Sequence, residues 1–155
     1  MNNQEKIEFK NKLKHFCEEL IQQRIDATKK AISNAREATN QEAKSTVGDK
    51  YETARAMGQL EQDMFARQLA ENLKEFSTLQ SIDANNICKE VGSGAYMQCQ
   101  NISFFIAAGL GKKSVEGKTI LFLSPNAPLA KILLHKKTGD SFVFNGANST
   151  IEDLF

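Results

Sequence analysis

The first half of the chain, residues 3–79, contains no proline and two glycines, Gly48 and Gly58. It is rich in Lys, Glu, Gln and Ala, which favour the helical backbone. Apolar or small residues recur there at close to helical spacing, in two series separated by the stretch STVGDKYETARA, residues 45–56. This pattern predicts two long helices over about residues 5–42 and 50–79.

The two helical series mirror each other about Thr46. Residues that face one another in an antiparallel hairpin have position numbers with a constant sum, and five pairs share one sum: Leu13 with Leu79, Phe16 with Phe76, Thr28 with Met64, Ile32 with Leu60, and Ala35 with Met57. The symmetry predicts a coiled-coil hairpin. At 1.5 Å per residue, such a hairpin reaches roughly 50 Å. Its side chains become smaller toward the turn, so we expect the hairpin to narrow there.

The second half of the chain has short runs typical of strands, at residues 95–100, 102–108, 118–124 and 140–146. The stretch PNAPLAKILLHKKTGD, residues 125–140, predicts a short helix with Asn126 as N-cap and Pro128 in its first turn. Leu129, Ile132 and Leu133 form its predicted apolar stripe, and Gly139 can end it. The sequence therefore predicts an α+β fold, in which a small antiparallel sheet carries one short helix. GLGKKS, residues 109–114, is interpreted as a loop.

These patterns divide the chain into a hairpin over residues 1–80, with an acidic tip near 45–53, and a β domain over residues 84–155. The 155 residues suit one medium domain or two small ones, and the net charge of +1 does not indicate nucleic-acid or membrane binding through bulk charge. The N-terminus is polar, and the longest apolar stretch, ISFFIAAGLG, is too short to span a bilayer. Cys17, Cys88 and Cys99 are odd in number and widely spaced, which fits a reducing compartment. We therefore expect a cytoplasmic protein.

Asp49 and Glu52 lie three residues apart where the chain must reverse. One interpretation is a capping box, in which both carboxylates also favour the positive end of the second helix. The other is that the carboxylates are held out on a stalk to act elsewhere. A long, narrow hairpin without a core at its end suits a tip that enters a deep site.

Two segments resemble a known family. The first has Ala35, Arg36 and Glu37, followed by Gly48, Asp49 and Glu52 at the turn. The second contributes ten matching residues: Pro128, Leu129, Ala130, Lys131, Leu133, Leu134, Lys136, Lys137, Gly139 and Asp140. Through them the sequence resembles the bacterial Gre transcript-cleavage factors over nearly the whole chain. The resemblance implies an N-terminal antiparallel coiled coil followed by a small domain similar to FK506-binding proteins.

The sequence departs from the family pattern at four places. The tip between Glu37 and Gly48 is longer, Thr53 replaces an Asn, Ala127 replaces a Ser, and His135 replaces a Gly. Since the family's relatives include factors that enter the same channel without stimulating cleavage, these departures bear on activity more than on fold.

The resemblance implies a transcription elongation factor whose partner is bacterial RNA polymerase. The coiled coil would enter the polymerase secondary channel, where Asp49 and Glu52 would help hold the second Mg²⁺ and position the attacking water. The polymerase would then cut the 3′ end of a backtracked transcript, so the factor would be no enzyme itself and would contact nascent RNA only indirectly. It would have no cofactor of its own, no membrane partner and no sequence-specific DNA binding. Asn126, Pro128 and Leu129 would bind the polymerase.

Two alternatives remain open. The chain is a Gre-like regulator or inhibitor that enters the channel without cleavage, or a coiled-coil interaction module unrelated to polymerase. A stand-alone enzyme is not favoured, because GLGKKS lacks the spacing of a phosphate-binding loop. Prolyl isomerase activity is not implied either, since similarity of fold does not carry function.

Overall fold

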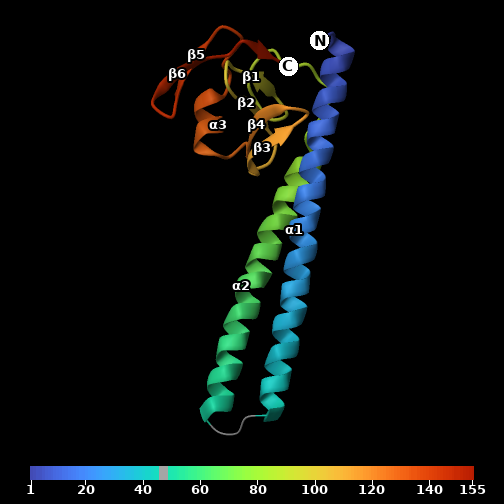
Figure 1. The fold of residues 1–155 in the computed structure, drawn as a ribbon, viewed down its shortest axis with the longest axis vertical. Coiled ribbons are helices and arrows are strands. Elements are labelled where there is room, and N and C mark those ends of the chain that lie inside the picture. Colours follow the sequence, from blue (N-terminus) through green and yellow to red (C-terminus); the bar gives the residue numbers. More distant parts are fainter. Residues whose placement is uncertain (46–48) are drawn as a thin grey trace. The chain divides into compact units, whose positions relative to one another are not determined.

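The computed structural model describes residues 1–45 and 49–155, with the side chains of residues 42–51 outside the description. Two long helices, α1 (Asn3–Ser45) and α2 (Asp49–Gln80), run antiparallel (Figure 1). The predicted helices are therefore confirmed to within three residues at each end. No helix in the described part of the chain is long and apolar enough to cross a membrane.

The start of α1 has a reciprocal cap that the sequence analysis missed. The backbone N–H of Glu5 donates to Asn2 Oδ1 at 2.8 Å, and the backbone nitrogen of Asn2 donates to Glu5 Oε2 at 3.0 Å. Together these bonds form a capping box. They satisfy two amides at the helix N-terminus, which otherwise lack a partner within the helix.

The chain forms two compact units, Leu20–Phe76 and a second unit made of Met1–Glu19 with Ser77–Phe155. The first contains the paired parts of α1 and α2. The second contains both ends of the chain and all the strands. Residues 3–19 of α1 therefore pack with the β region.

Within Leu20–Phe76, the inner face of α1 follows heptad spacing. The less exposed positions are Ile21, Ile25, Thr28, Ile32, Ala35 and Thr39. On α2 the matching positions are Ala54, Gly58, Gln62, Phe65, Leu69, Asn72 and Phe76. Spacings of three and four residues are those of a coiled-coil seam, so the hairpin is confirmed as two helices packed along such a seam.

The predicted register of the hairpin is wrong. It sets Ala35 opposite Met57 and Ile32 opposite Leu60, yet Met57 and Leu60 are each 64 % exposed. In the structure Thr39 faces Gly58, and Gln62 Nε2 donates to Thr39 Oγ1 at 3.5 Å. Near the turn, the seam of α2 therefore contains Gly58 and Gln62 and not Met57 or Leu60.

The second unit contains a five-stranded sheet with the order β3-β4-β2-β1-β7. Its strands are β1 (Tyr96–Gln98), β2 (Ser103–Ile106), β3 (Gly111–Val115), β4 (Lys118–Leu123) and β7 (Asp153–Leu154). A separate hairpin pairs β5 (Ser141–Phe144) with β6 (Ala147–Thr150). The predicted α+β class is confirmed, but the sheet is mixed rather than antiparallel throughout, because β2 and β4 run parallel. Residues 111–114, predicted as loop, belong to β3.

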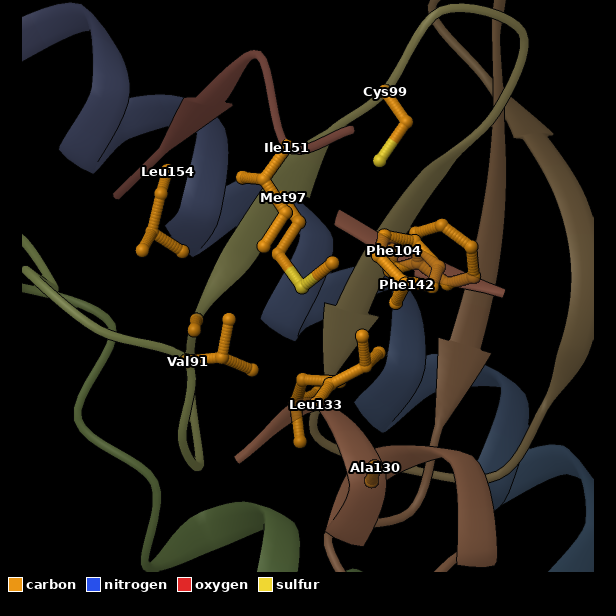
Figure 2. Packing of buried hydrophobic residues seen from close by; sticks show 11 residues of the cluster. Val91, Met97, Cys99, Phe104, Ala130, Leu133, Phe142, Ile151 and Leu154 are labelled. Atoms are coloured by element: carbon orange, nitrogen blue, oxygen red, sulfur yellow. The ribbon is translucent and has the colours of Figure 1, made fainter. Parts of the chain in front are cut away.

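The central strand β2 is buried on both faces of the sheet, which explains its continuous apolar run. On one face Phe104 packs edge-on against Phe142, with ring centroids 5.8 Å apart. Figure 2 shows Leu133 of the short helix α3 (Pro128–Leu133) directed toward this pair. On the other face α1 supplies Phe9, whose ring contacts Tyr96 at 5.1 Å. The sheet is thus the middle layer between α3 and the start of α1.

The local chemistry of α3 differs from the prediction in three ways. Its N-cap position is Ala127, without a side-chain cap, whereas Pro128 is at the first turn as predicted. Ile132 is 64 % exposed, and the buried stripe consists of Ala130 and Leu133. His135, which follows the helix, has a left-handed backbone with φ of 68°, and Gly139 adopts this conformation further along the chain.

Two lysines of α1 hold the connection between α2 and the sheet. Lys14 Nζ donates to Ile82 O at 2.7 Å, close to the end of α2. Lys10 is completely buried, and its Nζ donates to Asn86 O at 2.7 Å. Backbone carbonyls within residues 80–86 thus turn toward α1 and accept hydrogen bonds from its lysines.

Candidate functional site at the hairpin turn

Asp49 is the first residue of α2, and Glu52 lies three positions further along the same helix. Residues three apart lie on the same side of a helix. The Glu52 side chain is exposed. The Asp49 side chain and residues 46–48 lie outside the described residues, so the predicted capping box and the predicted direction of both carboxylates stay predictions.

The end of the hairpin near the turn is built from small residues. Ala35, Thr39, Ala54 and Gly58 occupy successive seam positions. A Cβ atom added at Gly58 would overlap Thr39 Oγ1 and lie 3.1 Å from Thr39 Cγ2. The two backbones therefore approach more closely than large side chains allow, which is the narrowing that the sequence predicts.

Charged side chains of both signs flank the seam close to the turn. Arg36 and Glu37 on α1, and Glu52 and Arg55 on α2, are all exposed. Exposed side chains of this kind remain available to a partner, because no packing holds them against the hairpin. Three of these four residues were noted in the sequence, and Arg55 was not.

Two carboxylates on one side of a helix have the chemistry of a partial Mg²⁺ site. Mg²⁺ prefers oxygen ligands and commonly uses one or two protein carboxylates, with water or substrate filling the other positions. Among the residues that the structure describes, no group of three or more His, Cys, Asp or Glu side chains could hold a metal.

The second predicted site lies at α3. Asn126 and Pro128 are exposed, and Leu129 is half-buried against the core of the second unit. The backbone N–H of Asn126 donates to Ser124 Oγ at 3.2 Å, so Asn126 lies in the turn before the helix. The structure adds two exposed apolar residues to this site: Ile132, predicted for the apolar stripe, is 64 % exposed, and Leu134 is 47 % exposed. Their exposure has no periodic signal in so short a helix.

No family model, curated protein or solved structure matches this chain.

Proposed function

We propose that this protein is a transcription elongation factor of Gre type. In this proposal its hairpin enters the secondary channel of bacterial RNA polymerase and stimulates cleavage of backtracked transcripts. The observation that carries the proposal is a hairpin of two helices, 43 and 32 residues long, whose turn is followed at once by Asp49 and Glu52. The resemblance of residues 35–52 and 128–140 to the Gre factors supports the same assignment.

The shape of the hairpin supports a tip that reaches into a deep site. At 1.5 Å per residue, α2 is about 48 Å long. Small residues on its seam near the turn keep that end slender. A hairpin that served only to bind along its side would gain nothing from a narrow end, since large seam residues stabilise a coiled coil better.

The chemistry proposed for the tip requires carboxylates. Mg²⁺ in the polymerase active site would activate water and offset the negative charge of the transcript phosphate. Asp49 and Glu52 would contribute oxygen ligands and negative charge at that place and would orient the attacking water. The protein is in this view no enzyme, because it completes the active site of the polymerase.

The second unit is proposed to adopt the FK506-binding-protein-like arrangement of the family and to dock on the polymerase through Asn126, Pro128 and Leu129. Support comes from the exposure of Asn126 and Pro128 and from the exposed apolar residues Ile132 and Leu134 on the same segment. Exposed apolar side chains next to polar ones are typical of protein interfaces. The proposal implies a cytoplasmic protein.

A transcript-cleavage assay on stalled, backtracked elongation complexes tests the proposal. Addition of the wild-type protein should shorten the RNA from its 3′ end and should restore elongation when nucleotides are added. Binding to polymerase without cleavage would instead support the non-cleaving regulator, the alternative that the departures at Thr53, Ala127 and His135 leave open. Absence of any binding would leave an interaction module unrelated to polymerase.

A further inference from the structure

A buried lysine contacts a cysteine at the connection between α2 and the sheet. Lys10 is completely buried, and its Nζ lies 3.7 Å from Cys88 Sγ, within hydrogen-bond distance for sulfur. The second bond of Nζ, to Asn86 O, fixes the ammonium group in this position. Burial lowers the pKa of Lys10, while Cys88 and the Asp83 carboxylate oppose that shift. A buried ammonium of this kind favours a negatively charged partner.

Cys88 also faces solvent. It is half-buried and lines a cavity of about 450 Å³, whose wall includes Asp83, Asn86, Ser93 and Asn126. The Asp83 carboxylate accepts hydrogen bonds from Asn85 N and Asn86 Nδ2, both at 2.9 Å, and these bonds hold the loop that forms the wall. A small polar oxidant that enters this cavity can therefore approach Cys88.

The other two cysteines are less accessible to solvent. Cys17 and Cys99 are buried. Burial, together with the Glu152 carboxylate, raises the pKa of the Cys99 thiol to about 11, so this thiol remains protonated at neutral pH. A thiol beside a cation and open to solvent is the reactive kind, whereas a buried thiol in apolar surroundings is inert.

We propose that Cys88 is a peroxide-reactive thiol, with Lys10 as the positioning residue that holds its sulfenic acid product. Cys88 Sγ attacks one oxygen of hydrogen peroxide, an S–O bond forms, and the O–O bond breaks. The departing hydroxide takes up the thiol proton and leaves as water. Sulfur loses two electrons and the peroxide gains two, so one thiol and one peroxide give one sulfenic acid and one water. Lys10 Nζ donates to the sulfur before the attack and to the product oxygen after it.

This inference does not depend on the proposed function, because Lys10 and Cys88 belong to the second unit and take no part in the turn of the hairpin. Its consequence is local. Oxidation adds an acceptor oxygen to Cys88, which Lys10 of α1 contacts. The added oxygen strengthens the hydrogen bond between α1 and the loop at residues 83–88.

The test is to treat the full-length protein with hydrogen peroxide, trap sulfenic acid with dimedone, and locate the adduct by peptide mass spectrometry. We expect Cys88 to be labelled before Cys17 and Cys99. We also expect it to be labelled about tenfold faster than the same residue in the urea-unfolded chain, the effect of roughly one hydrogen bond to a charged group. Equal rates for folded and unfolded Cys88 would overturn the proposal without the use of any variant.

A pair of lysine variants separates the charge from the structure. Lys10→Met removes the ammonium beside Cys88 and should slow its labelling about tenfold. Lys14→Met is the matched control, because Lys14 bonds to the same connection through Ile82 O and touches no cysteine. It should leave the labelling rate unchanged. Equal slowing or equal acceleration in both variants would mean that loosening of the loop, and not the Lys10 charge, controls the thiol, and the proposal would be wrong.

Discussion

Gly58→Ala should destabilise the hairpin, although alanine is the better helix former. The added Cβ would overlap Thr39 Oγ1 and lie 3.1 Å from Thr39 Cγ2 and 3.2 Å from Thr39 Cβ. Rotation of the Thr39 side chain cannot remove the last contact. The same rotation would also break the hydrogen bond that Thr39 Oγ1 donates to Ala35 O, which measures 2.8 Å.

The magnitude follows from two opposing terms. Alanine gains about 0.8–1.0 kcal/mol over glycine inside a helix. Overpacking costs about 1–3 kcal/mol, and a lost hydrogen bond costs about 0.5–1.5 kcal/mol more. The sum is a net loss of about 0.5–3.5 kcal/mol in the free energy of unfolding. Urea unfolding followed by far-UV circular dichroism measures it, since most of the helix lies in α1 and α2.

Two further variants make this prediction sharp. In a Thr39→Ala background the same Gly58→Ala change should stabilise the hairpin by up to about 1 kcal/mol, because the overlapping side chain is gone. Met57→Ala should cost less than about 0.5 kcal/mol, since Met57 is exposed. If Gly58→Ala alone stabilised the protein and Met57→Ala cost about 2 kcal/mol or more, the register described here would be wrong and the mirror pairing of the sequence right.

Four shorter predictions follow from other parts of the structure. Asn2→Ala removes one partner of the capping box and should lower the unfolding free energy by about 0.5–2 kcal/mol in urea titrations. An unchanged unfolding free energy would show that the cap does not stabilise the protein. His135→Gly should raise the unfolding free energy by about 0.5–1 kcal/mol, because glycine adopts the φ of 68° at this position without strain. The lost ion pair with Glu90 is exposed and contributes little. A lower melting temperature would refute this prediction. The pKa of Cys99 is about 11 in the folded state, whereas that of an ordinary thiol is near 9. The free energy of unfolding should therefore fall as the pH rises from 9 to 11, and Cys99→Ala should lessen this fall by about 2 kcal/mol. Asn126→Ala with Pro128→Ala should weaken polymerase binding, measured by co-sedimentation, more than it lowers the melting temperature; unchanged binding would count against docking through this segment.

The sequence predicted the helices of the hairpin well, because their signal is long, periodic and free of proline. It did not predict their register. The seam of α2 includes Gly58, Gln62 and Asn72, whereas Met57 and Leu60 lie outside it. A search for apolar residues therefore selects the wrong face, and only the heptad spacing with its small and polar members identifies the right one.

The β region shows a second limit. The apolar run at β2 was recognised, because its residues are buried on both faces. Strand β3 was missed, because four of its five residues are exposed, and it is a strand through its pairing with β4. This pairing is local, because only Glu116 and Gly117 separate the two strands, and both have a positive φ as in a tight hairpin turn. The parallel pairing of β2 with β4 was beyond the sequence, because it joins strands that are not consecutive in the chain.

The candidate sites differ in what the sequence could reveal. Asp49, Glu52 and the α3 segment were found through local motifs and a family resemblance. The capping box of Asn2 and Glu5 has a recognisable spacing and could have been found in the same way. The contact between Lys10 and Cys88 could not, because it joins residues 78 positions apart.

The measurement that tests the proposed function most directly compares transcript cleavage by two matched variants. Asp49→Asn with Glu52→Gln removes both tip carboxylates but keeps side chains suited to a capping box, so it should fold and bind polymerase normally. Glu61→Gln with Asp63→Asn makes the same charge change at exposed positions further along α2. We predict that the tip variant loses cleavage on backtracked complexes steeply, since a neutral amide is a weak Mg²⁺ ligand, while the control variant cleaves like the wild type. Undiminished cleavage by the tip variant would contradict the account and would return Asp49 and Glu52 to the role of a helix cap.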